Sequence, residues 1–153
     1  MTAHDSESVV DSPTDWVADH IRRYIETDGE EGHLFMGFPT LLLTTRGRRS
    51  GRRRRTALIY GEDSGRLLLV ASNGGAHAHP AWYLNLREHP EVEVQVRADR
   101  FTATARTASP EERPRLWDHL VGVFPQYAEY QQKTDRNIPV VILERAGTAP
   151  AGS

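Results

Sequence analysis

The sequence predicts an α+β protein built around a small antiparallel barrel, closed or half-closed, with helices flanking it. Two observations support this prediction. About six segments have the composition of strands, and short turns join most of them, as in antiparallel hairpins. Segments with helical spacing lie at the start, in the middle and near the end of the chain, and do not alternate regularly with the strands. That arrangement is typical of α+β folds.

The length and composition fit one folded domain: 153 residues, with 38% apolar and 26% charged residues. We expect a disordered acidic N-terminus over residues 1–12, the folded domain over 13–145 and a flexible tail over 146–153. No apolar run is long enough to span a membrane, and the N-terminus lacks a signal-peptide pattern. The chain has no cysteine, so disulfides and thiolate chemistry are excluded, and a cytoplasmic location is the default.

The first helix is predicted to begin at Ser12-Pro13, with Ser12 as N-cap, and to end before Gly29. Its apolar face recurs at helical spacing and comprises Trp16, Val17, His20, Ile21, Tyr24 and Ile25. Such a helix usually packs over one end of a barrel. A protein partner or a membrane surface could also cover the same face, which leaves peripheral membrane association open.

The strands are predicted from apolar runs and alternation. We expect them at Thr40–Thr45, Arg53–Tyr60, Arg66–Ser72, Glu91–Val96, Phe101–Thr107 and Ile138–Leu143. Gly61–Gly65 forms the turn before the third of these, whose continuous apolar run indicates burial on both faces. In the fourth, the valines alternate with Glu91, Glu93 and Gln95, which indicates one exposed face.

Three further helical segments are predicted. Pro80–Glu88 opens at a proline and ends before Pro90. Ser109 caps a helix whose first position is Pro110 and whose apolar face includes Leu116 and Leu120. Tyr127–Asp135 follows after an interruption at Pro125.

Seven arginines lie between Arg46 and Arg55, interrupted only by Gly47, Ser50 and Gly51. So many guanidinium groups repel one another unless an anion lies among them, and glycines allow backbone N–H groups to approach the same anion. The loop can be a solvated charged connection, a nucleic-acid contact, or a site for a phosphorylated or polycarboxylate small molecule. A calculated pI near 6.4 and the acidic remainder disfavour nucleic acid.

The stretch from Ser72 to Ala76, SNGGA, directly follows the buried strand. It is either a plain turn or the polar edge of a pocket for a flat heterocycle. Tyr127 and Tyr130 share a helical face with Phe124, and this aromatic stripe is either core or the mouth of a pocket.

Metal and nucleophilic chemistry have little support in the sequence. His77 and His79 lack partnering carboxylates at ligand spacing, so we expect no metal site. No nucleophile with a partnered base can be identified either.

Four stretches, in order and spacing, resemble the deazaflavin-dependent nitroreductases: LLLTTRGRRSGRRRRTALIYG, LVASNGGAHAHPAWYLNL, EVEVQV and YQQKTDRNIPVVILE. The resemblance runs from about Phe38 to Glu144. It implies a split β-barrel that binds coenzyme F420, an 8-hydroxy-5-deazaflavin with a phosphodiester-linked oligoglutamate tail. Members transfer a hydride from the reduced cofactor to quinones, enones or nitroaromatic compounds.

The resemblance also implies site residues, carried over by position. The phosphate and tail fall on Arg48, Arg49, Ser50 and Arg54. The ring system lies along Thr56, Ala57, Leu58 and Ile59, with its other edge at Val70, Ala71, Ser72 and Asn73. The pocket is closed by Ala81, Trp82 and Asn85, and the tyrosines on the substrate side are Tyr127, which also contacts the cofactor, and Tyr130.

Three positions depart from the family's pattern. Asn73 stands where a lysine is common, Phe124 where a tyrosine often stands, and Lys133 where an aromatic residue is familiar. These changes lie mostly on the substrate side, so they bear on nitro reduction more than on cofactor binding.

A deazaflavin carries the hydride itself, so the protein needs no nucleophile, metal or redox cysteine. We expect Ser72, Tyr127 and Tyr130 to act catalytically by stabilising negative charge that develops on the acceptor. The closest competing hypothesis is a split-barrel protein that binds flavin mononucleotide or haem. The sequence is also compatible with a nucleic-acid or anion-binding module without catalysis, and with a protein that only stores the deazaflavin.

Overall fold

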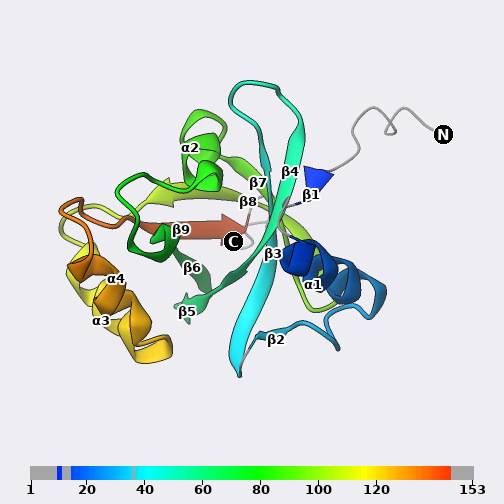
Figure 1. Ribbon diagram of the computed structural model, residues 1–153, viewed down its shortest axis with the longest axis horizontal. Coiled ribbons are helices and arrows are strands. Elements are labelled where there is room, and N and C mark those ends of the chain that lie inside the picture. The colour runs from blue at the N-terminus through cyan, green and yellow to red at the C-terminus, as the bar shows by residue number, and fades with distance from the viewer. Residues whose placement is uncertain (1–9, 12–14, 36, 146–153) are drawn as a thin grey trace.

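The computed structural model describes residues 10–11, 15–35 and 37–145. One curled sheet forms the centre, and helices lie on both sides of it (Figure 1). The strands are β1 (Val10–Asp11), β2 (Leu34–Phe35), β3 (Phe38–Arg46), β4 (Arg53–Ile59), β5 (Gly61–Asp63), β6 (Arg66–Val70), β7 (Glu91–Val96), β8 (Asp99–Thr107) and β9 (Val140–Arg145). The helices are α1 (Asp15–Glu26), the 3₁₀ helix η2 (Asn73–Gly75), α2 (Ala81–Glu88), α3 (Arg113–Val123) and α4 (Gln126–Gln132).

The strand order is β1-β4-β3-β7-β8-β9-β6-β5, with β2 paired to β3. Strands β4 and β5 lie towards opposite ends of this order, yet only Tyr60 separates them in the chain. The sheet must therefore curl until its two ends meet near Tyr60. Every pairing is antiparallel except that of β1 with β4. The predicted α+β fold with a half-closed, mostly antiparallel barrel is confirmed.

The turn predicted at Gly61–Gly65 is shorter than expected. Gly61–Asp63 form β5, and the turn is confined to Ser64 and Gly65, both of which have positive φ. Strand β6 pairs with β5 and β9 and does not pair with β4. The sequence correctly predicts that the chain reverses direction before β6. It carries no local signal that β6 pairs with β9 across the barrel.

The apolar run of β6 is buried on both faces because two cores meet there, as predicted. Leu67 and Leu69 pack in the core enclosed by the barrel, beside Leu41 and Leu43 of β3. The alternate residue Leu68 packs in a second core, between the sheet and helices α3 and α4. Both layers therefore depend on this one strand.

Strand β7 follows the predicted alternation with one exception. Val92 and Val94 are buried, and Glu91 and Glu93 are exposed. Gln95 was expected on the exposed face, but it is buried, and its side-chain amide donates to the Arg97 carbonyl at 2.8 Å. This hydrogen bond satisfies a polar group that would otherwise be costly to bury.

Helix α1 packs on the sheet, as its amphipathic pattern predicts. Ile21 and Tyr24 are fully buried against Leu42. The Tyr24 hydroxyl accepts from the Arg97 N–H at 2.6 Å and can donate to the Thr40 carbonyl at 3.0 Å. Val17 and Ile25 on the same face of α1 are partly buried and pack against this cluster. None of the described helices is long and apolar enough to cross a membrane.

The chain ends differ from the sequence prediction in one respect. Residues 1–12 were expected to be disordered, but Val10–Asp11 form β1, which pairs in parallel with Arg54 and Arg55 of β4. A two-residue strand with a distant partner leaves no periodicity to detect. The remaining N-terminal residues, the predicted Ser12-Pro13 helix start and the tail over 146–153 lie outside the described residues.

The predicted cap before α3 is present, although α3 itself begins at Arg113. The Ser109 hydroxyl accepts from the Glu112 N–H at 3.2 Å, and the Glu112 carboxylate accepts from the Ser109 N–H at 2.9 Å. This reciprocal pair is a capping box. Two hydrogen bonds from Arg106 join the Ser109 N–H bond in holding the pKa of the Glu112 carboxyl at about 2.

Candidate functional site

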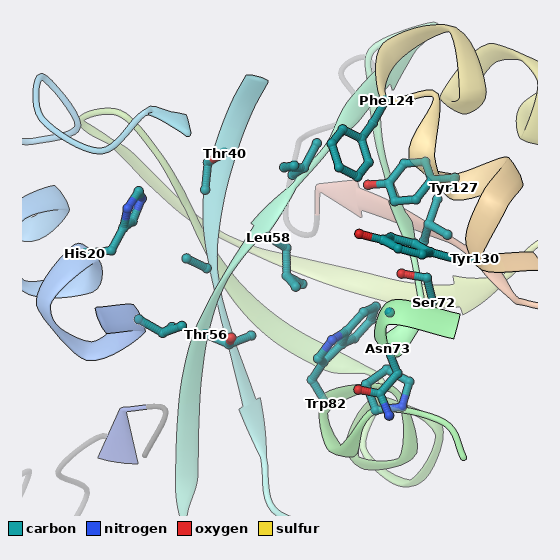
Figure 2. A pocket seen from close by; sticks show the side chains of 16 residues that line it. His20, Thr40, Thr56, Leu58, Ser72, Asn73, Trp82, Phe124, Tyr127 and Tyr130 are labelled. Carbon is teal, nitrogen blue, oxygen red and sulfur yellow. The ribbon is translucent and has the colours of Figure 1, made fainter. Parts of the chain in front are cut away.

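A cavity of about 450 Å³ opens beside β4 (Figure 2). This volume is ordinary for a small-molecule site. Its walls come from α1, β3, β4, the end of β6 with η2, the start of α2, and the segment from Phe124 into α4. The lining residues are Val17, His20, Thr40, Thr56, Ala57, Leu58, Ile59, Val70, Ser72, Asn73, Gly74, Pro80, Trp82, Phe124, Tyr127 and Tyr130. No carboxylate is among them and most are apolar, so the cavity suits a mainly apolar group.

The wall along β4 includes an open sheet edge. β1 covers β4 only at Arg54 and Arg55, so on that side no described strand pairs with Thr56–Ile59. The Tyr60 N–H donates to the Pro39 carbonyl of β3 at 3.1 Å. The backbone N–H and C=O of one residue point to the same side of a strand, and this side alternates along the chain. Since Tyr60 faces β3, the N–H and C=O groups of Ala57 and Ile59 point away from β3. These free backbone donors and acceptors can bind the polar edge of a planar ring.

The opposite wall is the SNGGA loop. Ser72 is buried, and its hydroxyl has no hydrogen-bond partner among the described residues. Asn73 has a φ of +50°, which asparagine tolerates, and its amide donates to the Ala78 carbonyl at 3.1 Å. The amide therefore stabilises the loop. Gly74 has a φ of +65°, and a Cβ there would meet nothing within 4 Å, so the loop leaves open space beside its backbone.

The third wall carries the aromatic residues of the C-terminal helices. Figure 2 shows the hydroxyl groups of Tyr127, Tyr130 and Ser72 along one side of the cavity. The Tyr130 hydroxyl donates to the Gln126 side-chain carbonyl at 3.0 Å. Burial raises the pKa of Tyr127 far above its ordinary value of 10.0, so its hydroxyl stays protonated at neutral pH.

The two interpretations of the aromatic stripe are both correct for Tyr127. Its ring belongs to the core between the sheet and α3, and packs edge-on against Phe124 at 5.0 Å between centroids. The same residue lines the cavity. Tyr130 also lines the cavity, but it is less buried and packs at the edge of that core.

The arginine-rich segment from Arg46 to Arg55, called the arginine loop below, lies around the tip of the β3–β4 hairpin, next to α2. Two of its arginines are committed within the protein: the Arg46 guanidinium donates to the Gly51 carbonyl at 2.6 Å, and Arg53 forms an ion pair with Glu93. Four other arginines of this segment have no acceptor for their guanidinium groups among the described residues: Arg48, Arg49, Arg52 and Arg54. By strand alternation, Arg54 lies on the same face of β4 as Thr56 and Leu58. An anionic group could therefore extend from the cavity to the free guanidinium groups.

Asn85 of α2 stabilises this loop through hydrogen bonds. It is buried, its side-chain carbonyl accepts from the Arg48 N–H at 3.1 Å, and its amide donates to the Thr45 hydroxyl at 3.2 Å. Ser50 is likewise engaged, because its hydroxyl accepts from the Arg52 N–H at 3.1 Å. These two side chains shape the loop without lining the cavity.

Most of the predicted ring contacts line the cavity. Nine of the sixteen predicted cofactor-binding residues are among the lining residues: Thr56, Ala57, Leu58, Ile59, Val70, Ser72, Asn73, Trp82 and Tyr127. The other seven are Arg48, Arg49, Ser50, Arg54, Ala71, Ala81 and Asn85. Arg48, Arg49 and Ser50 lie in the arginine loop, as does Arg54 at the start of β4, and Ala71 is fully buried.

Some lining residues were not predicted from the sequence as site residues. Val17 and His20 reach the cavity from α1, and Thr40 from β3. The pattern of α1 showed which face is buried but not that this face borders a cavity. The His20 ring donates through Nε2 to the Gly32 carbonyl at 2.8 Å, which fixes its orientation. Among the described residues, no group of three side chains could hold a metal ion.

Comparison with known proteins extends these observations. A sequence profile described as F420H(2)-dependent quinone reductase matches residues 16–145. An F420H(2)-dependent quinone reductase of Mycobacterium tuberculosis is 40% identical over 130 residues, covering 82% of this chain and 87% of that protein. A solved F420-H2 dependent reductase is 45% identical, with a TM-score of 0.65 over 69% of this chain and 94% of the other. Another solved chain, described as a domain-swapped dimer, is 42% identical, with a TM-score of 0.67 over 87% and 100%.

The contact between the SNGGA loop and α4 yields a test that needs no ligand. Gly75 has a φ of +85°, and a Cβ there would lie 2.8 Å from the Tyr130 carbonyl oxygen. Gly75→Ala should lower the free energy of unfolding by about 3 kcal/mol, through left-handed strain and overpacking. Gly74→Ala is the matched control and should cost about 1–2 kcal/mol, from strain alone. Equal losses in chemical denaturation would show that α4 does not depend on this close approach.

Proposed function

Because the chain belongs to the F420H(2)-dependent quinone reductase family, we propose that it transfers a hydride from reduced coenzyme F420 to a quinone. The family resemblance inferred from the sequence motifs is confirmed. We extend the proposal to enones and nitroaromatic compounds, which are also flat and electron-poor. The observation that supports it best is an apolar cavity along β4, a strand that also carries Arg54, one of four guanidinium groups near the hairpin tip that lack partners among the described residues.

The residues present fit F420. The open edge at Ala57 and Ile59 suits the polar edge of the ring system, and Gly74 leaves room beside its backbone. Trp82 supplies an apolar surface from α2. Arg49 and Arg54 can hold the phosphate and the glutamate tail, because guanidinium groups bind phosphate and carboxylate bidentately.

Arg48 and Ser50 belong to the same tail site in this proposal, and Arg52 joins them because its guanidinium is equally free. Ser50 contributes by shaping the loop. Asn85 acts indirectly, by fixing the backbone at Arg48. Ala71 and Ala81 support the ring-binding segments and make no contact of their own with the cavity.

When bound and reduced, F420 supplies the hydride. The protein's own task on the acceptor side is to stabilise the negative charge that the acceptor gains. Ser72 and Tyr127 carry hydroxyl groups without partners among the described residues, so each can donate to the acceptor oxygen. Tyr127 keeps its proton at neutral pH because burial raises its pKa. The Tyr130 hydroxyl is oriented by Gln126 and can donate after exchanging that partner.

The cofactor is tested by titrating the protein with F420 and flavin mononucleotide side by side, monitored by fluorescence. We expect binding of F420 and little binding of flavin mononucleotide. With reduced F420 and menadione, the visible absorbance of oxidised F420 should then appear at a rate proportional to enzyme. Tight flavin binding would favour a flavin protein instead. F420 binding without turnover would favour storage of the cofactor.

The tail site is tested with single arginine variants. Arg49→Ala and Arg54→Ala should each weaken F420 binding about 5-fold, because each removes one exposed charge-assisted contact. The melting temperature should stay near the wild-type value. Arg100→Ala, in a separate groove, is the control for net charge and should leave affinity unchanged. Wild-type affinity in either test variant would remove that residue from the tail site.

The acceptor side is tested with Tyr130→Phe. Its turnover of menadione should fall about 10-fold while its affinity for F420 stays within about 2-fold, because the lost hydroxyl acts on the acceptor. The ring, and hence its packing against Phe124, is preserved. Unchanged turnover with a lower melting temperature would instead assign Tyr130 to the core.

A further inference from the structure

Arg136 connects two walls of the cavity without lining it. Its Nη2 donates to the Ser72 carbonyl at 2.7 Å, and its Nε donates to the Ala76 carbonyl at 2.9 Å. Its Nη1 lies 3.0 Å from Nδ1 of His79. One guanidinium therefore spans the whole loop from Ser72 to His79, and it uses all three of its nitrogens to do so.

The backbone of Arg136 is fixed in turn to α4. The Gln131 side-chain amide donates to the Arg136 carbonyl at 2.8 Å, and the Gln131 side-chain carbonyl accepts from the Ile138 N–H at 3.0 Å. Arg113 of α3 donates to the same Gln131 oxygen at 3.2 Å and to the Ile138 carbonyl at 2.7 Å. The segment after α4 is thus held by directed bonds on both sides.

We propose that Arg136 is a positioning residue that holds Ser72 in register with Tyr127 and Tyr130, and that it does so only while His79 is neutral. The inference rests on the proposed function, because it assumes that these three hydroxyls serve the acceptor. A guanidinium nitrogen can only donate, so Nδ1 of His79 must accept, and its ring proton lies on Nε2. Protonation of His79 would place a second donor opposite Arg136 and break this contact.

The surroundings of His79 favour its neutral form. Burial lowers its pKa below the ordinary 6.5, and the cations Arg136 and Arg87 lower it further. The Tyr83 ring packs against it, at 4.9 Å between centroids. The other titratable group of the loop, His77, faces the Thr134 hydroxyl at 3.4 Å. The contact is therefore complete above pH 6.5 and is lost as the pH falls through the lowered pKa of His79.

Two variants separate positioning from general stability. Arg136→Lys keeps the charge but cannot reach three acceptors, so kcat for menadione should fall about 10-fold or more at neutral pH, with a smaller change in KM. His79→Asn offers a carbonyl oxygen near the position of Nδ1 and does not titrate. It should keep kcat within about 2-fold of wild type at neutral pH, and the acid-side loss of kcat seen in the wild type should be reduced. Arg115→Lys, which alters a similar multidentate contact to Asp63 on the far side of α3, should leave kcat unchanged.

The protein without cofactor provides an independent readout. The amides of Gly75 and Ala76 donate to the Ser72 and Asn73 carbonyls, so their hydrogen exchange reports the order of the loop. Exchange at both should become faster in Arg136→Lys but not in Arg115→Lys. In an NMR titration, the pKa of His79 should rise towards 6.5 when Arg136 is replaced by alanine.

The possible failures are distinguishable. A wild-type protein that does not oxidise reduced F420 with menadione overturns the proposed function, whatever the loop amides show. An active wild type whose Arg136→Lys variant matches Arg115→Lys in kcat and amide exchange overturns the positioning role. An unchanged acid limb in an active His79→Asn variant overturns the requirement for neutral His79.

Discussion

The rest of the structure depends on one constraint: at Tyr60, between β4 and β5, the chain changes its pairing partner. Before Tyr60 the chain pairs with β3, and after it the chain pairs with β6. Tyr60 is buried at the junction, and burial, assisted by the Glu62 carboxylate, raises its pKa to about 12. A strand that changes partners in this way closes the barrel there but leaves Thr56–Ile59 of β4 without a described strand paired on one side. The open edge of the cavity therefore follows from the way the barrel closes.

Charge is distributed according to the same geometry. Alternation along β4 sends Arg53 to the face that carries Glu93, where it is neutralised, and Arg54 to the face shared with Thr56 and Leu58. At the hairpin tip, Arg46 is used to close the loop onto the Gly51 carbonyl. One arginine is thus paired with a carboxylate and another is hydrogen-bonded within the loop, while Arg54 stays available on the face of β4 shared with cavity residues. Mutual repulsion among the arginines of the loop is a stability cost that an anionic ligand would relieve.

Local patterns predicted the fold class and most strands, because alternation at β7 and the apolar run of β6 directly reflect burial. They could not predict β1, the partner of β6, or the placement of α1 beside the cavity, since these depend on residues far apart in sequence. For the site, the motifs gave nine lining residues as cofactor contacts and Tyr130 as a catalytic residue, whereas Val17 and Thr40 carry no local mark of function. The indirect role of Asn85 was equally hidden, because its partners lie about forty residues away.

The two halves of the cavity are built on different principles, and this bears on the departures from the family's pattern. The half at β4 uses backbone groups, so side-chain changes there alter it little. The other half uses side chains on a frame held by Gly75 and Arg136. Lys133 lies over the Tyr130 ring at 5.7 Å, and Phe124 packs edge-on between Phe38 and Tyr127. Both departures thus contact the tyrosines that line the cavity, so changes at these two positions can reshape this half while the half at β4 stays the same.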